Sequence, residues 1–87
     1  ALELLPEDAA VLDSMGWVKY RLEDYEAALH YLRQAFEASP DPEIAAHLSE
    51  VLWVSGATDE ARAVWRESID QHPEDEHLIE VQERFGL

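Results

Sequence analysis

Histidines and carboxylates are the side chains here that could bind a metal ion, because the sequence contains no cysteine. The densest group is segment 72–77, with the sequence HPEDEH, in which two imidazoles flank three carboxylates. Pro73 breaks any helix through this segment, and the spacing matches no zinc-binding motif. Two histidines beside a helix start are usually solvated surface residues. The sequence therefore predicts no metal site and no cofactor.

The residues needed for catalysis are also missing. None of the serines at positions 14, 39, 49, 55 and 68 has a histidine and an acid at the spacing of a known motif. Neither His30 nor His47 has an acid and a nucleophile around it in sequence. With only three glycines, the chain has no glycine-rich loop that could hold a phosphate. We expect that this chain is not an enzyme.

The charge of the chain limits its partners. Twenty acidic residues against six basic ones give a formal net charge of −14. Such a chain repels nucleic acids, which are bound through lysine and arginine, and it repels anionic bilayers for the same reason. Long-range attraction instead favours a cationic or neutral protein surface, although the charge could equally serve solubility alone. No apolar run is long enough to span a membrane, so no direct insertion is expected.

Apolar residues recur at helical spacing in four segments, expected at 8–22, 24–38, 42–55 and 59–71, and no segment alternates with the period of a strand. A fifth helix is expected at 76–85. The predicted N-caps are Asp8, Asp24, Asp41, Thr58 and Asp75. Gly56 and Gly86 are placed to end helices. Linkers of two to four residues require each helix to fold back antiparallel on the one before it. The fold class is therefore all-α, in one domain.

The sequence also repeats itself. Residues of matching size recur 33 positions apart: Met15 and Leu48, Gly16 and Ser49, Ala28 and Ala61, Leu32 and Trp65, Ala35 and Ser68, and Pro40 and Pro73. Small residues at three of these pairs indicate places where paired helices approach closely. Large residues at Leu32 and Trp65 are expected to fill the space between layers. Such a period is typical of a helical solenoid.

The string Leu12-x-x-Met15-Gly16, followed by Tyr25-x-x-Ala28, Leu32, Ala35 and Pro40, resembles the tetratricopeptide-repeat (TPR) consensus. The second copy is looser, with Ala45 where the first copy has Leu12 and a loop that is one residue shorter. The resemblance implies a right-handed superhelix of antiparallel helix pairs. It divides the chain into the end of a preceding repeat (1–6), repeat one (8–40), repeat two (41–73) and a capping helix (75–86).

In this family the first helix of each pair lines a concave groove that binds peptides or helices. Carried over by position, the resemblance implies a partner-binding groove formed by Asp13, Trp17, Tyr20, Arg21, Ala46, Glu50 and Trp53, with Ala10, Ser14, Glu43, His47 and Val54 also facing it. An aromatic residue there can equally pack only against the next repeat. Trp65 is expected to be structural.

One subgroup of the family grips a C-terminal carboxylate with groove lysines and asparagines. This sequence departs from that pattern, because Asp13 and Trp17 stand where those residues are needed. The groove suits a cationic or apolar protein segment instead. The resulting hypothesis is a protein–protein interaction scaffold or adaptor. The alternative is a structural C-terminal cap for a longer solenoid whose upstream repeats carry recognition.

Two further expectations concern the surroundings of the chain. Only a helical stub precedes the first repeat, so its apolar N-terminal edge is expected to be bare and able to self-associate. The segment from Leu12 to Leu22 is also similar to stretches in large repeat proteins of Gram-negative bacteria, some of them outer-membrane lipoproteins that tether periplasmic enzymes. That similarity implies a parent protein in the periplasm or at the outer membrane, with a periplasmic enzyme as one candidate partner, while the cytoplasm stays open as the alternative compartment.

Overall fold

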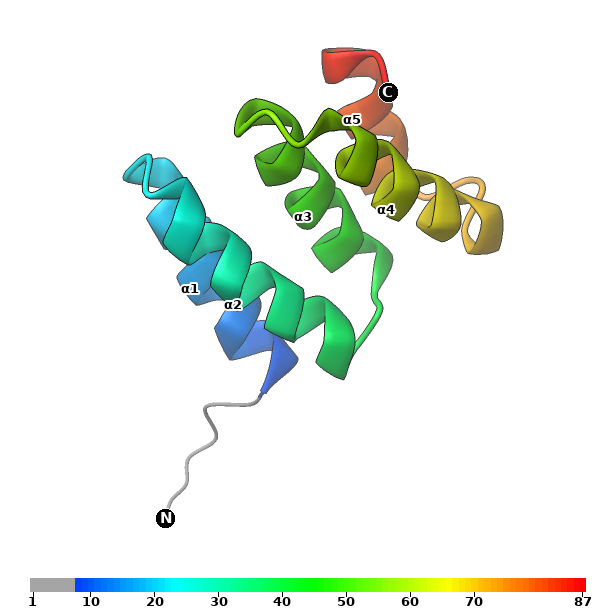
Figure 1. Cartoon of the computed structure of the whole chain (residues 1–87). Helices are drawn as coiled ribbons and strands as arrows, with labels where there is room; N and C mark the ends of the chain where they lie inside the picture. The colour runs from blue at the N-terminus through cyan, green and yellow to red at the C-terminus, as the bar shows by residue number, and fades with distance from the viewer. Residues whose placement is uncertain (1–7) are drawn as a thin grey trace.

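The computed structural model describes residues 8–87, which form five α-helices joined by short turns (Figure 1). The helices are α1 (Ala9–Arg21), α2 (Tyr25–Ala38), α3 (Pro42–Val54), α4 (Thr58–Gln71) and α5 (Glu76–Phe85). Each begins and ends within one residue of the range that the apolar spacing predicts. The predicted stub of a preceding repeat, 1–6, lies outside the described residues. No helix among residues 8–87 has the length and apolar character needed to cross a membrane.

Side-chain caps fix where most of these helices begin. The carboxylates of Asp8, Asp24, Asp41 and Asp75 each accept a hydrogen bond from a backbone amide in the turn that follows, as predicted. The predicted cap at Thr58 is wrong. Ala57 is the N-cap of α4, and its methyl side chain has no oxygen that could accept a hydrogen bond. Its backbone amide donates to the Leu52 carbonyl at 2.9 Å, and the helix already begins at Thr58.

Positive φ angles occur at both glycines predicted to end helices. Gly56 has a φ of 103° directly after α3, and Gly86, the C-cap of α5, has a φ of 75°. Side chains with a Cβ rarely adopt this region, so glycine suits both turns.

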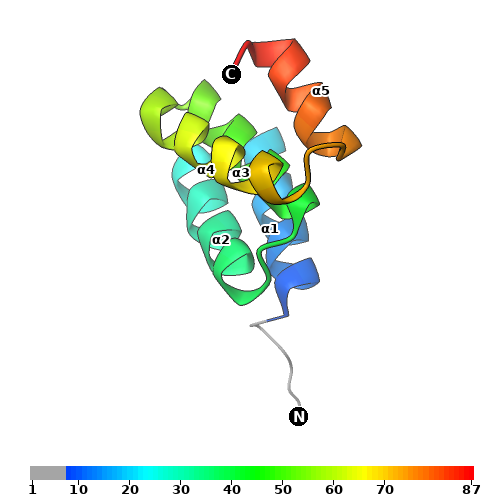
Figure 2. The same ribbon diagram turned by 90° about the vertical axis from the view of Figure 1, so that its right-hand side faces the viewer.

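The helices form two antiparallel pairs, α1 with α2 and α3 with α4, stacked side by side (Figure 1). α1 and α3 approach each other directly, whereas the backbones of α2 and α4 make no such approach within residues 8–87. The inner helices α1 and α3 are thus closer together than the outer ones, which curves the stack toward them. α5 follows as a further helix that packs mainly on α3 and only lightly on α4 (Figure 2).

Small residues lie where the paired helices touch. Ala28, Ala35, Ser49 and Ala61 have no exposed surface, as their repeated positions predict. Gly16 has the tightest contact: a Cβ placed there would lie 2.7 Å from the Cγ of Leu32 and 3.2 Å from the Ala28 carbonyl oxygen. Glycine at this position therefore sets the distance between α1 and α2.

Gly16→Val is expected to lower the free energy of unfolding by about 2–3 kcal/mol, because the new side chain must displace the buried Leu32. Ser14→Val is the matched control, since it adds bulk to an exposed position of the same helix and is expected to change stability by less than about 0.5 kcal/mol. Urea denaturation followed by circular dichroism measures both. Equal effects for the two variants would contradict a close contact at Gly16.

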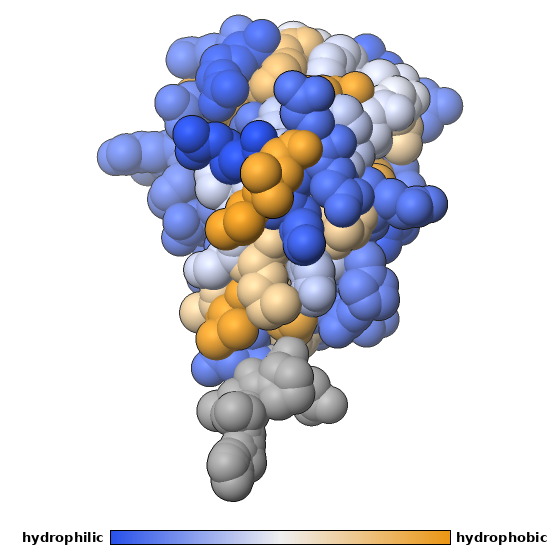
Figure 3. Space-filling view, turned by 90° about the vertical axis from the view of Figure 1, so that its left-hand side faces the viewer, coloured by the Kyte–Doolittle hydropathy of each residue, from blue (hydrophilic) through white to orange (hydrophobic). Residues whose placement is uncertain are grey.

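The apolar stripe of α1 faces solvent. Val11, Met15, Val18 and Leu22 are all exposed large hydrophobics, and the residues of α1 that are buried are Leu12 and Gly16. Figure 3 shows apolar side chains gathered on this side of the molecule, which α1 and α2 form. The positions 33 residues later, Ile44, Leu48 and Val51, are buried against the preceding helix pair. Within residues 8–87 the apolar stripe at the start of the stack is therefore exposed, whereas the matching stripe of α3 is covered.

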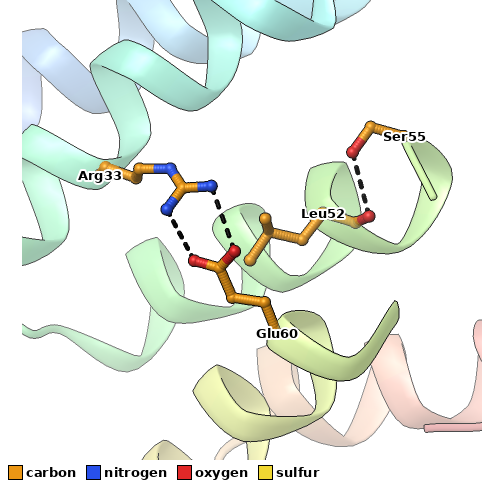
Figure 4. A network of polar contacts seen from close by, with 4 residues as sticks. All are labelled: Arg33, Leu52, Ser55 and Glu60. Atoms are coloured by element: carbon orange, nitrogen blue, oxygen red, sulfur yellow. Dashed lines mark hydrogen bonds and ion pairs between the residues drawn. The ribbon is translucent and has the colours of Figure 1, made fainter. Parts of the chain in front are cut away.

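The outer helices are linked by an ion pair. The guanidinium of Arg33 on α2 donates two hydrogen bonds to the Glu60 carboxylate on α4, at 2.6 and 3.2 Å, and near it the Ser55 hydroxyl donates to the Leu52 carbonyl (Figure 4). Arg33 and Glu60 are half exposed, so the pair contributes at most about 1 kcal/mol.

Candidate functional site on the inner helices

The inner helices α1 and α3 meet at a pair formed by Asp13 and His47. The Nδ1 atom of His47 lies 2.8 Å from an oxygen of the Asp13 carboxylate, and both side chains are largely buried, at 20% and 16% exposure. The Trp17 ring stacks on the imidazole with ring centres 4.2 Å apart. One face of the His47 ring is therefore covered by tryptophan, which fixes the orientation of the imidazole toward Asp13.

About two turns beyond Asp13 on α1, a second polar group joins three helices. The Tyr20 hydroxyl donates a hydrogen bond of 2.8 Å to Glu50 on α3, and Arg84 on α5 lies 3.5 Å from the other oxygen of that carboxylate. Glu50 is only 4% exposed. Burial, followed by the hydrogen bond and the charge of Glu50, raises the pKa of Tyr20, so the phenol stays protonated and remains the donor. This buried carboxylate on α3 is thus held by groups from α1 and α5.

The structure groups some of the predicted groove residues and separates others. Asp13, Trp17, Tyr20 and Glu50 lie in one continuous set of contacts, with Trp17 and Tyr20 ring centres 4.9 Å apart. Arg21 is exposed at the end of α1.

One predicted groove residue is buried, and another packs against the core and α4. Ala46 is buried in a cluster with Leu78 and Val81, because α5 covers this part of α3. The groove assignment of Ala46 is therefore wrong. Trp53 is half buried against the core, and the Arg62 guanidinium from α4 lies 5.1 Å from its ring centre. Its side chain is largely engaged within the domain.

Two residues of this face were absent from the predicted binding set. His47 was expected only to face the groove, and the sequence offered no sign of its pairing with Asp13, which lies 34 residues away. Arg84 lies on the last helix, outside both repeats whose positions predict the groove. Its contact with Glu50 depends on where α5 packs, and no local pattern encodes that position.

The acidic surroundings of His47 outweigh its burial. Burial alone lowers the pKa of an imidazole, but the hydrogen bond to Asp13 and the charges of Asp13, Glu43 and Glu50 together raise the pKa of His47 above 6.5. A raised pKa in the folded state means that the protonated ring is stabilised by folding. This stabilisation is complete below pH 6.5 and is lost as the pH rises through the folded pKa.

We expect an NMR titration of the His47 ring to give a pKa above 6.5 in the wild-type protein and a lower one in Asp13→Asn. The difference in unfolding free energy between the two proteins should shrink as the pH rises through the wild-type value. An unchanged His47 pKa in Asp13→Asn would contradict the role given to this pair.

Antiparallel helix pairs with a 33-residue period, close-packed small residues and a curved inner face define a helical-repeat scaffold. The family described as Tetratricopeptide repeat matches residues 14–76, and the chain belongs to this family. Repeats of this family generally mediate protein–protein interactions, and proteins built from them are generally non-catalytic scaffolds.

A curated relative, the TPR repeat-containing protein PA4667 of the bacterium Pseudomonas aeruginosa, is 54% identical over 50 residues. Those residues make up 58% of this chain and 8% of the relative. The chain thus spans a small part of the length of that protein.

Proposed function

We propose that this chain is a protein-interaction module, or adaptor, that binds a cationic segment of a partner protein on the inner face of α1 and α3. The observation that supports this most is the half-buried Trp17, which lies beside Tyr20 and stacks on His47. The carboxylates of Asp13 and Glu43 lie near the same His47 imidazole. An aromatic face beside carboxylates suits an arginine or lysine side chain, which gains both charge attraction and stacking.

Electrostatics supports the same class of partner. The net charge of −14 attracts cationic segments over long range and speeds their encounter with the module. The exposed residues of the inner face, Ala10, Ser14 and Glu43, are small or acidic and leave room for an incoming chain. A periplasmic enzyme tethered by a lipoprotein parent is the partner that the sequence similarity to Gram-negative repeat proteins suggests.

The second candidate function is a structural cap for a longer solenoid. It is favoured by α5, which covers α3 at Ala46 and occupies the inner helices' next position in the stack. A chain with this role would hold the end of an array and leave partner recognition to other repeats.

Site-specific photocrosslinking separates the two functions. A photoreactive amino acid at Ser14 on the inner face is compared with one at Glu37 on outer helix α2, in extracts of a Gram-negative bacterium. The adaptor function predicts a crosslinked partner from position 14 alone. The yield of this crosslink should be higher at low salt than at high salt, because salt screens the charge attraction. The crosslink should be lost when Trp17 is also changed to alanine. Circular dichroism checks that each variant is folded. Crosslinks of equal yield from both positions, or crosslinks that survive Trp17→Ala, would favour the capping role.

A further inference from the structure

We propose that Asp13, Glu43 and His47 form a binding site for a divalent transition-metal ion, of which zinc suits the donors best. The site lies where α1 meets α3, so a bound ion would link two successive helix pairs. No metal site was expected from the sequence, because metal-binding motifs are recognised from ligands close together along the chain. Here Asp13 and the other two ligands come from different helices. The site shares Asp13 and Glu43 with the proposed partner-binding face, but its test uses the isolated chain and an inorganic ion, so either proposal can fail without the other.

The geometry of the three donors supports the site. One ligand atom from each of Asp13, Glu43 and His47 lies within 4.8 Å of the other two. Glu43 and His47 are one turn apart on α3, a spacing that places both side chains on the same face of a helix. Asp13 and His47 are already in contact at 2.8 Å. Donors around a tetrahedral zinc ion are about 3.3 Å apart for bonds of about 2.0 Å, so this contact would need to open only slightly.

The chemistry of the donors selects the kind of ion. One imidazole nitrogen and two carboxylate oxygens form a mixed set that zinc, cobalt and nickel accept, whereas magnesium and calcium prefer oxygen ligands alone. The metal would replace the proton shared by His47 and Asp13, and water would complete its coordination. The stacked Trp17 ring already holds the imidazole in place, so little side-chain freedom is lost on binding.

A second histidine–carboxylate pair in the chain provides the control. His77 and Asp75 lie 3.5 Å apart at the start of α5, where the His77 side chain is 51% exposed. Within residues 8–87, the group of Asp13, Glu43 and His47 is the one in which a third ligand joins such a pair. Zinc binding at the inner face should therefore not depend on His77.

Isothermal titration with zinc chloride, and visible absorption after addition of cobalt(II), test the site on the whole chain. We expect one ion per wild-type chain and tetrahedral cobalt bands. Glu43→Gln, an exposed substitution that leaves the Asp13–His47 contact intact, should weaken binding by about 10-fold or more, and His47→Gln should abolish it. His77→Gln should bind as the wild type does.

Three outcomes would overturn the proposal. They are the absence of saturable binding, wild-type affinity in Glu43→Gln, and an equal loss of affinity in His77→Gln. Circular dichroism of each variant without metal confirms that a lost signal reflects the ligands and not the fold.

Discussion

Trp65→Ala is expected to lower the free energy of unfolding by about 3–5 kcal/mol and to release α5 from the rest of the domain. Trp65 is only 9% exposed and packs in the cluster that contains Leu78 and Val81 of α5. Its indole nitrogen donates a hydrogen bond of 2.8 Å to the Leu78 carbonyl. The substitution removes both the largest side chain of this cluster and the polar contact that ties α4 to α5.

Chemical denaturation and hydrogen exchange of the α5 amides measure this effect. Trp65→Phe keeps most of the volume but loses the donor, so it should cost less, about 1–2 kcal/mol, and keep α5 protected. Trp53→Ala is the matched control, because Trp53 is half buried and packs against a different core cluster from Leu78 and Val81 of α5. Unchanged exchange in α5 of Trp65→Ala would show that this tryptophan does not hold the last helix.

Leu48→Ala is expected to cost about 2–5 kcal/mol, whereas Met15→Ala should cost less than about 1 kcal/mol. The two residues occupy equivalent positions, 33 residues apart, on α3 and α1. Leu48 is 2% exposed in the core between the helix pairs, but Met15 is 40% exposed on the bare face of α1. The same repeat position is thus buried in one pair and exposed in the other.

Urea denaturation of both variants, with analytical ultracentrifugation of the wild type, measures this difference. The control is a double variant, whose cost should equal the sum of the two single costs if Met15 and Leu48 do not interact. Equal costs for the single variants would mean that the face of α1 is covered in solution, most simply by a second copy of the chain.

Local chemistry explains why the helices could be predicted from the sequence. Aspartates capped four helices because a short carboxylate reaches the free amides of the following turn, whatever the rest of the fold does. The N-cap predicted at Thr58 is wrong because the turn after Gly56 is short, so α4 begins at Thr58 itself, one residue earlier than expected. The 33-residue period predicted the close contacts at Gly16 and Ala28, since both depend on residue size and repeat spacing alone.

The inner face could be predicted only in part. Repeat position predicts which side of a helix Asp13, Trp17 and Tyr20 occupy, and the structure brings these residues together. It does not predict what covers that side. Ala46 is buried because α5 packs on α3, and the pairing of Asp13 with His47 depends on the distance between two repeats. Both are tertiary features without a local sequence signal.

The Glu50 carboxylate also bears on how the domain deforms. On the inner side it joins α1 through Tyr20 and α5 through Arg84, and it is shielded from salt by burial. On the outer side the helix pairs are linked by Arg33 and Glu60, which are half exposed and readily screened. Under tension or in high salt, the contact between the outer helices α2 and α4 should therefore open first. The inner side, where Glu50 is buried, should resist deformation more than the outer side does.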